Sequence, residues 1–97
     1  MDYEILQTTV FAQWHTTQRD LRARIAIARR IERASAGNLG DVKNFGGGLS
    51  KMRVNTGAGY HLYFTGRGNT LIVLLLGGDK SSQPADICQA RSLAKEF

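Results

Sequence analysis

The sequence predicts an α+β domain in which one short strand is followed by two helices, three more strands and a closing helix. Two observations carry this prediction. Apolar residues recur at helical spacing in the first third of the chain and at its end, and β-rich runs separated by glycine-containing turns fill the middle. The chain has 97 residues, which fits a single domain over residues 1–97 with a four-stranded sheet.

The N-terminal third is predicted to hold the first strand and a helical hairpin. Residues 3–6 alternate apolar and polar side chains, which indicates a strand, and Phe11 and Trp14 then recur at helical spacing. Asp20 suits the N-cap of a second helix, and Gly37 suits the position just after its end. The apolar stripe expected to face the sheet consists of Leu21, Ile25, Ala28 and Ile31.

A group of arginines forms the densest basic surface in the sequence. On a helix of 3.6 residues per turn they project within about a quarter-turn of one another, away from the apolar stripe. This surface fits a solvated helix face, a phosphate contact or a contact with an acidic protein. The formal net charge of +5 favours an anionic partner without choosing its class. The members of the group are Arg19, Arg22, Arg29, Arg30 and Arg33.

Three strands and a helix are predicted in the rest of the chain. The run Leu71–Leu76 is apolar on both faces, which is typical of a central strand covered on both sides. Gly77 and Gly78 are expected to end that strand, and Ser81–Pro84 to begin the closing helix. The other two strands are Leu49–Val54 and Tyr60–Thr65, with turns at Gly46–Gly48, Gly57–Gly59 and Gly66–Asn69. The face of the closing helix is Ile87, Ala90, Ala94 and Phe97.

Cysteine content and hydropathy exclude several classes of protein. Cys88 stands alone, so it forms no internal disulfide, and one thiol is too few for a structural zinc site. We therefore expect a reducing, cytoplasmic setting and no metal or cofactor. The N-terminus has acidic residues where a signal peptide needs basic ones, and no apolar run approaches the roughly 20 residues that span a bilayer.

A basic α+β domain with polar residues at its strand ends fits RNA binding or cleavage. Metal-free cleavage needs a base near a 2′-hydroxyl, positive charge at the scissile phosphate and an acid for the leaving 5′-oxygen. Arg53 can bind a phosphate through two hydrogen bonds, with Lys51 as its neighbour on the same face. Tyr60 and His61 begin the next strand, so only one of them shares the Arg53 surface unless a bulge intervenes. Lys80 follows the central strand.

Each candidate also has a purely structural interpretation. Lys51 and Arg53 fit exposed strand charges, Lys80 fits a loop cation, and His61 fits a half-buried sheet histidine. Asp79 can orient a neighbouring side chain. His15 and Trp14 are expected to be structural, and no histidine lies near Cys88 in sequence to activate it as a nucleophile.

Three segments together resemble a known family: Gly40–Arg53, Gly57–Tyr60 and Leu74–Gln83. They resemble the addiction-module killer proteins, the phage-derived HigB-like toxins of the RelE/ParE superfamily. The resemblance covers almost the whole chain, and the GGDKSSQ stretch after an apolar strand is its most specific part. It implies a RelE/ParE-like fold, a twisted and mostly antiparallel sheet with a helical hairpin on one side and a C-terminal helix.

The resemblance also implies a function, the toxin of a type II toxin–antitoxin pair. Toxins related to RelE and HigB are metal-independent endoribonucleases that cleave messenger RNA on the ribosome. A cognate antitoxin, here expected to have a helix-turn-helix domain, neutralises the toxin. Operator DNA is expected to be contacted only through this antitoxin. No membrane partner is implied. Two alternatives stay open: a ParE-like toxin that poisons DNA gyrase without chemistry, and a non-toxic nucleic-acid-binding domain.

The resemblance assigns roles to several residues. Lys51-Met52-Arg53 resembles the Lys-Leu-Arg strand motif of RelE-like nucleases, so Arg53 is expected to face the scissile phosphate and Lys80 to stabilise transition-state charge. The family commonly has Arg where this chain has His61. The tyrosine of the RelE C-terminal helix is absent, so Tyr60, His61 or the ribosome is expected to supply the base. RNA or ribosome contacts are expected from Lys43, Lys51, Arg67, Arg22, Arg29 and Arg33.

Overall fold

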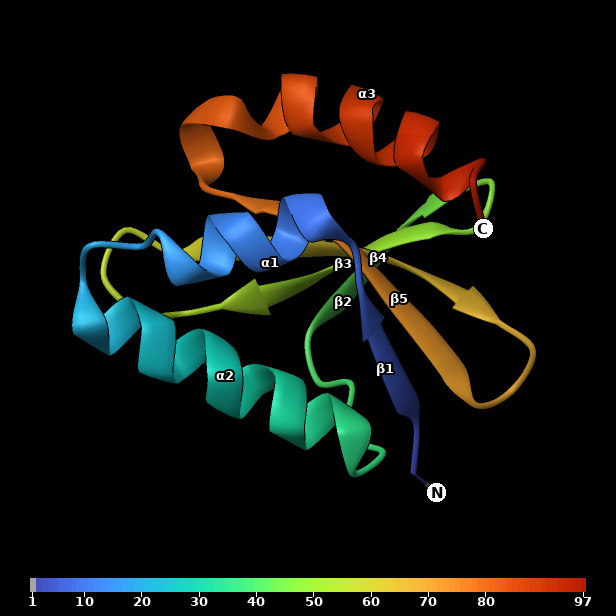
Figure 1. The fold of residues 1–97 in the computed structure, drawn as a ribbon, viewed down its shortest axis with the longest axis horizontal. Coiled ribbons are helices and arrows are strands. Elements are labelled where there is room, and N and C mark those ends of the chain that lie inside the picture. The colour runs from blue at the N-terminus through green and yellow to red at the C-terminus, as the bar shows by residue number, and fades with distance from the viewer. Residues whose placement is uncertain (1) are drawn as a thin grey trace.

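A five-stranded mixed sheet runs through the middle of the computed structural model, which describes residues 2–97, and helices cover both of its faces (Figure 1). The strand order is β1-β5-β4-β3-β2. β1 pairs with β5 in parallel, and the other neighbouring strands are antiparallel. The predicted α+β class is confirmed. The strands are β1 (Glu4–Gln7), β2 (Val42–Gly46), β3 (Leu49–Val54), β4 (Tyr60–Arg67) and β5 (Leu71–Gly78).

The predicted count of four strands is wrong, because β2 adds a fifth at the sheet edge. β2 pairs with β3 through a tight turn in which Gly47 and Gly48 have φ values of 61° and 82°. Positive φ at both central residues is typical of the type I′ turn, whose twist matches that of a β-hairpin. The Gly46–Gly48 segment is therefore the turn of this hairpin.

The predicted helical hairpin is confirmed. It consists of α1 (Thr9–Thr16) and α2 (Leu21–Ser35). The Asp20 side chain caps α2 by accepting a hydrogen bond from the Arg22 N–H at 2.9 Å. Gly37, at φ 98°, follows its C-terminus, where the Asn38 N–H donates to the Arg33 carbonyl oxygen at 2.9 Å. This pattern is the Schellman motif.

The sheet separates two apolar clusters. The hairpin side buries Phe11, Ile27, Ala34, Met52, Val54, Leu62, Phe64, Ile72 and Leu74. On the other side lie a short 3₁₀ turn, η1 (Lys80–Ser82), and the closing helix α3 (Gln83–Ala94). That side buries Leu49, Tyr63, Val73, Leu75, Leu76 and Ala90. Figure 1 shows α2 and α3 on opposite sides of the sheet.

The predicted buried face of α2 is wrong at Leu21 and Ile25, whereas Ile31 packs against the buried cluster. Leu21 and Ile25 are 57% and 44% exposed, and the face that meets the sheet includes two alanines, Ala23 and Ala34. Large apolar residues dominate a hydrophobicity pattern, whereas alanines allow a helix to lie close to a sheet. In α2, this close approach determines which face is buried. The buried residues of α2 are Ala23, Ile27, Arg30 and Ala34. Arg30 therefore does not belong to the solvated arginine face.

Arg30 is only 5% exposed, and its guanidinium donates to backbone carbonyl oxygens. Nε donates to Arg53 at 3.1 Å, and Nη2 donates to Leu39. These bonds tie α2 to the end of β3 and to the segment that leads into β2. A charged residue on the buried face is possible because the carbonyl oxygens replace part of its hydration.

The glycines at the end of β5 do not end the strand, contrary to the prediction. β5 runs through Gly77 and Gly78, since their lack of a side chain leaves room for other groups. A Cβ atom at position 77 would overlap the Trp14 ring, and one at position 78 would overlap the Asp86 carboxylate. Trp14 packs against Gly77 and the ring of Phe11, as its predicted structural role requires.

Two further boundaries differ from the predictions. β4 continues through Arg67, so the turn predicted at Gly66–Asn69 begins later, because both Gly66 and Arg67 pair with β5. α3 ends at Ala94, so Phe97 lies beyond the helix and is 50% exposed. Within residues 2–97, no helix combines the length and the apolar character that crossing a bilayer requires.

Candidate functional site

The α3 side of the sheet brings together several residues predicted to act on RNA. β3 and β4 pair so that Arg53 lies opposite His61 and Lys51 lies opposite Tyr63. Residues directly opposite each other on neighbouring strands share a face. Tyr63 packs under α3, and Lys51 Nζ donates to Oε1 of Gln83, the first residue of α3, at 2.9 Å. Lys51, Arg53 and His61 therefore share the face that α3 partly covers.

Tyr60 does not join this group. It lies opposite Val54, and its ring contacts Trp14 edge-on at 6.1 Å, on the side of the helical hairpin. Alternation along β4 thus separates Tyr60 from His61, and no bulge intervenes between them. Of the two residues proposed as the base, His61 shares the surface of Arg53.

His61 is buried beside two cations of β3. It is 7% exposed, and its Nδ1 has no hydrogen-bond partner among residues 2–97. Burial lowers the pKa of His61 below its ordinary value, and the positive charges of Lys51 and Arg53 lower it further. The ring is therefore neutral at neutral pH, the form that accepts a proton in general-base catalysis.

A buried carboxylate lies on the other side of His61. Asp86, in the first turn of α3, is 8% exposed, and its Oδ2 accepts a hydrogen bond from Ser82 Oγ at 2.5 Å. The negative charges of Asp86 and Asp79 oppose the lowering of the His61 pKa. Burial raises the pKa of Tyr63 to about 12, with Asp86 contributing, so the phenol keeps its proton.

Two lysines and an aromatic ring extend the site onto β2. Lys43 lies opposite Lys51 across the β2–β3 ladder. Their Nζ atoms stand 5.4 and 5.8 Å from the centre of the Phe45 ring, and that ring stacks on Tyr63 at 6.4 Å. Burial lowers the pKa of Lys51, and the charges of Lys43 and Arg53 lower it further. The result is a cationic surface with a half-buried aromatic ring at its centre.

Lys80 and Asp79 lie at the end of β5. Asp79 caps η1, where its Oδ1 accepts from the Ser81 N–H at 2.9 Å and from Ser81 Oγ at 2.6 Å. These hydrogen bonds lower the pKa of Asp79. Lys80 follows in η1 and is exposed. The Asp79 side chain therefore orients the turn that carries Lys80.

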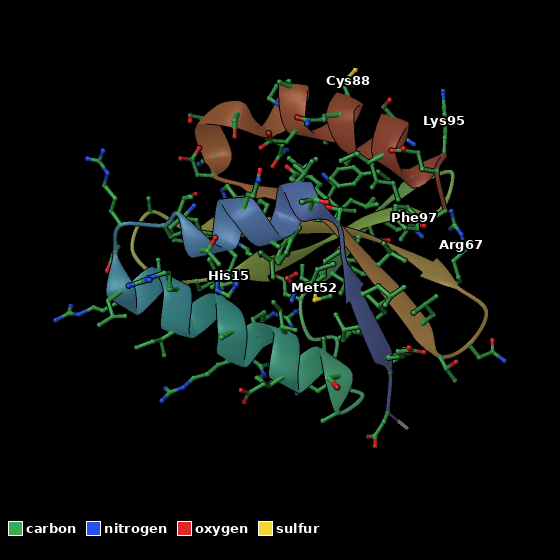
Figure 2. All side chains as sticks on the ribbon, viewed as in Figure 1. His15, Met52, Arg67, Cys88, Lys95 and Phe97 are labelled. Carbon is green, nitrogen blue, oxygen red and sulfur yellow. The ribbon has the colours of Figure 1, made fainter. Side chains whose placement is uncertain are left out.

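Arg67 lies away from this group, at the opposite end of β4. Its Nε donates to the Phe97 carbonyl oxygen at 2.6 Å, and its Nη2 donates to that of Ala94 at 2.9 Å. Figure 2 shows Arg67 beside Phe97 and Lys95. Arg67 lies six positions along β4 from His61, about 20 Å at 3.3 Å per residue. Arg67 joins β4 to the end of α3.

The other predicted arginines line an open groove of about 700 Å³ between α2 and the end of β3. Arg22, Arg29 and Arg33 come from α2, where Ile25 lies among them, and Arg53 lines the groove from β3. Arg53 is thus common to the groove and to the surroundings of His61. The groove combines positive charge with exposed apolar surface.

Two residues considered from sequence lie apart from both regions. His15 Nε2 is 3.0 Å from the Arg24 carbonyl oxygen, and Figure 2 shows the side chain between α1 and α2. Cys88 is exposed and points outward from α3 (Figure 2). Within the described range, no three His, Cys, Asp or Glu side chains are grouped so that they could hold a metal ion.

Comparison with known proteins places the chain in a family. No family model matches the sequence. The chain is 41% identical over 97 residues to an uncharacterized protein of Haemophilus influenzae, across 100% of this chain and 98% of that relative. The chain belongs to the same family as this Haemophilus influenzae protein.

Sequence reasoning missed two residues of the site in this family member. Phe45 is absent from the site residues predicted from the sequence, although Lys43 and Phe45 stand two apart, the spacing that places side chains on one face of a strand. No sequence pattern connects Asp86 with His61, because their closeness depends on how α3 crosses the sheet. Together the site offers a neutral base, fixed cations and an aromatic surface, a combination suited to phosphodiester chemistry on single-stranded RNA.

Proposed function

We propose that the protein is the toxin of a type II toxin–antitoxin pair, a HigB-like member of the RelE/ParE superfamily that cleaves messenger RNA on the ribosome. The observation that carries the proposal is the pairing of Arg53 with His61, with Lys51 on the same face of the sheet. The arrangement of a helical hairpin on one side of the sheet and a C-terminal helix on the other also supports it.

The proposed reaction is an internal transfer that needs no water in its first step. Neutral His61 takes the proton of a ribose 2′-hydroxyl, and the 2′-oxygen attacks the adjacent phosphorus. The bond from phosphorus to the 5′-oxygen breaks, which leaves a 2′,3′-cyclic phosphate and a 5′-hydroxyl. Arg53 binds the phosphate oxygens, and Lys80 adds positive charge as negative charge develops.

Lys51 suits the proton donor to the leaving 5′-oxygen. It is half-buried, and burial together with Lys43 and Arg53 lowers its pKa. A lysine with a lowered pKa gives up its proton more readily than one in water. It lies on the same strand as Arg53, two residues away, and therefore faces the same phosphate.

Phe45 suits a contact with a nucleobase. Single-stranded RNA is commonly bound by aromatic rings that stack on bases, with cations along the backbone. The Phe45 ring has this setting, with the ammonium groups of Lys43 and Lys51 near it. A base at this position would leave its phosphate directed toward the cations of β3.

The α2 groove suits the antitoxin. Ile25 is an exposed apolar residue of the groove, and the arginines beside it supply positive charge. A segment with both acidic and apolar side chains complements such a surface. Since Arg53 also lines the groove, a segment bound there lies next to the strand end that carries the proposed phosphate contact.

A purified translation system with one defined message tests the proposal. Primer extension maps 5′ ends for the wild type, for Arg53→Ala and for wild type without ribosomes. Arg24→Ala is the matched control, because Arg24 is exposed on α2 and outside the residues that line the groove. We expect cuts at regular positions within codons that need ribosomes and Arg53. Intact message with normal protein output contradicts the proposal, and a gyrase supercoiling assay then tests the ParE-like alternative.

A further inference from the structure

Asp86 is a buried carboxylate that helix capping does not explain. It is 8% exposed and lies one turn beyond Ser82, the N-cap residue of α3. Its Oδ2 accepts a hydrogen bond from Ser82 Oγ at 2.5 Å. A buried carboxylate is costly unless hydrogen bonds or opposite charges compensate for its lost hydration. A single serine is a small set of partners for such a group.

Gly78 determines where this carboxylate lies. A Cβ at position 78 would overlap the Asp86 carboxylate, so the carboxylate occupies the space that a side chain at 78 would fill. Gly78 lies directly opposite His61 in the β4–β5 ladder. Side chains at such positions share a face, with Cβ atoms about 4.5–5.5 Å apart. Asp86 therefore stands beside His61, as a cross-strand neighbour would.

Two buried polar atoms on this face have no hydrogen-bond partner among residues 2–97, His61 Nδ1 and Tyr63 Oη. The two rings are 6.2 Å apart and meet edge-on. Buried polar atoms of folded proteins usually have a partner, so atoms without one point to a functional arrangement. Both can donate a hydrogen bond, whereas the neighbouring carboxylate can only accept.

We propose that Asp86 is the positioning residue for His61, and that its carboxylate accepts the Nδ1–H of the imidazole so that Nε2 becomes the proton acceptor. The role rests on the proposed RNA cleavage. Catalytic hydrogen bonds are often long in a free enzyme and shorten when substrate binds. Because a neutral imidazole carries one proton, holding it on Nδ1 keeps Nε2 free to act as the base.

Charged and titratable groups face His61 from every neighbouring element. Lys51 and Arg53 come from β3, Tyr63 from β4 itself, Asp79 from the end of β5, and Asp86 from α3. The two cations favour the neutral ring and the two carboxylates favour the protonated ring. Replacing Asp86 with a neutral residue therefore lowers the pKa of His61 further. It also removes the preference of the His61 imidazole for one tautomer.

The first experiment observes His61 without any activity measurement. Imidazole ¹⁵N and proton shifts of the wild type and of Asp86→Asn give the tautomer and the pKa of His61, and His15 serves as an internal reference on α1. We expect one dominant tautomer in the wild type, and a mixture with a lower pKa in the variant. Asp79→Asn is the matched control: it also removes a nearby carboxylate, and we expect it to leave the tautomer unchanged.

Two more variants keep the proposal testable if Asp86→Asn does not fold. Gly78→Ala displaces the carboxylate while residue 86 stays aspartate, and we expect it to change the His61 tautomer as Asp86→Asn does. Asp86→Glu keeps an acceptor, and we expect it to restore the tautomer in part. An unchanged tautomer and pKa in both Asp86→Asn and Gly78→Ala overturn the proposal.

Cleavage assays separate this proposal from the proposed function. General-base catalysis contributes about 10²–10⁴-fold, so we expect Asp86→Asn to lose roughly tenfold or more in rate, with the pH dependence of cleavage moved to lower pH. A rate and pH profile equal to those of the wild type overturn the positioning role. Where the wild type leaves message intact but His61 responds to Asp86, the nuclease proposal fails and the pairing of Asp86 with His61 is supported.

Discussion

Arg30 of α2 donates from Nε to the backbone carbonyl oxygen of Arg53, 3.1 Å away at the end of β3. The buried Arg30 side chain thus holds the backbone of Arg53, whose own side chain is exposed. The Arg53 side chain lies beside His61 on the α3 side, while its carbonyl is tied to the helix on the other side. The position of the proposed phosphate contact therefore depends on how α2 packs.

Arg30→Met tests this tie. The change leaves the carbonyl oxygens of Arg53 and Leu39 without the guanidinium, and each lost buried hydrogen bond costs about 1–3 kcal/mol. We expect the free energy of unfolding in urea to fall by about 2–4 kcal/mol. The control is Arg33→Met on the exposed side of the same helix, where a change within about 0.5 kcal/mol is expected. Equal effects would refute a special role for Arg30.

Arg53→Ala tests the phosphate contact. Because Arg53 is exposed, we expect stability to change by less than about 0.5 kcal/mol, while cleavage on the ribosome falls about 100-fold or more. The rate of appearance of new 5′ ends measures the loss. Arg53→Lys is expected to recover only part of the rate, since lysine cannot make two parallel hydrogen bonds to a phosphate. Full activity in Arg53→Ala would exclude the assignment.

The pH dependence of stability tests the environment of His61. Its pKa is lowered in the folded protein, so between that value and the unfolded value of about 6.5 the unfolded chain binds more protons. The contribution of His61 to stability is therefore complete above about pH 6.5 and is lost as the pH falls through the folded pKa. Urea unfolding of the wild type and of His61→Gln at several pH values isolates this contribution. Parallel curves would contradict it.

Phe45→Leu tests the stacking surface. Stacking of a base on an aromatic ring contributes about 1–3 kcal/mol, so we expect affinity for short single-stranded RNA to fall by roughly 5- to 150-fold. Fluorescence anisotropy with a labelled oligonucleotide measures this change. Phe45→Tyr keeps the ring and should bind as the wild type does. A leucine variant with unchanged affinity would show that the base lies elsewhere.

Arg29→Glu combined with Arg33→Glu tests the groove as the antitoxin surface. The two changes reverse charge on the exposed side of α2 and leave Lys51, Arg53 and His61 in place. We expect the variant to cleave message and to escape neutralisation by the cognate antitoxin. The escape is measured as the growth of cells that express the antitoxin together with either the wild-type toxin or the variant. Neutralisation equal to that of the wild type would place the antitoxin on another surface.

Part of the candidate site could be predicted from the sequence. The same-face relation of Lys51 and Arg53 depends only on the alternation of a strand, and so does the separation of Tyr60 from His61. Whether Tyr60 or His61 shares a face with Arg53 depends on the register of β4 against β3. Alternation within one strand does not predict that register. The place of Asp86 depends on how α3 crosses the sheet, which no pattern within one segment contains.

By itself the sequence determined the local elements of this protein. Asp20 and Gly37 mark the ends of α2, and Leu71–Leu76 marks the central part of β5, because capping and strand propensity act over a few neighbouring residues. Only the tertiary structure decided the buried face of α2, the addition of β2 and the meeting of Asp86 with His61. The face of α2 and the meeting of Asp86 with His61 depend on close approach between distant segments, which alanine and glycine permit, and small side chains leave little trace in a hydrophobic pattern. β2 belongs to the sheet because its backbone pairs with β3.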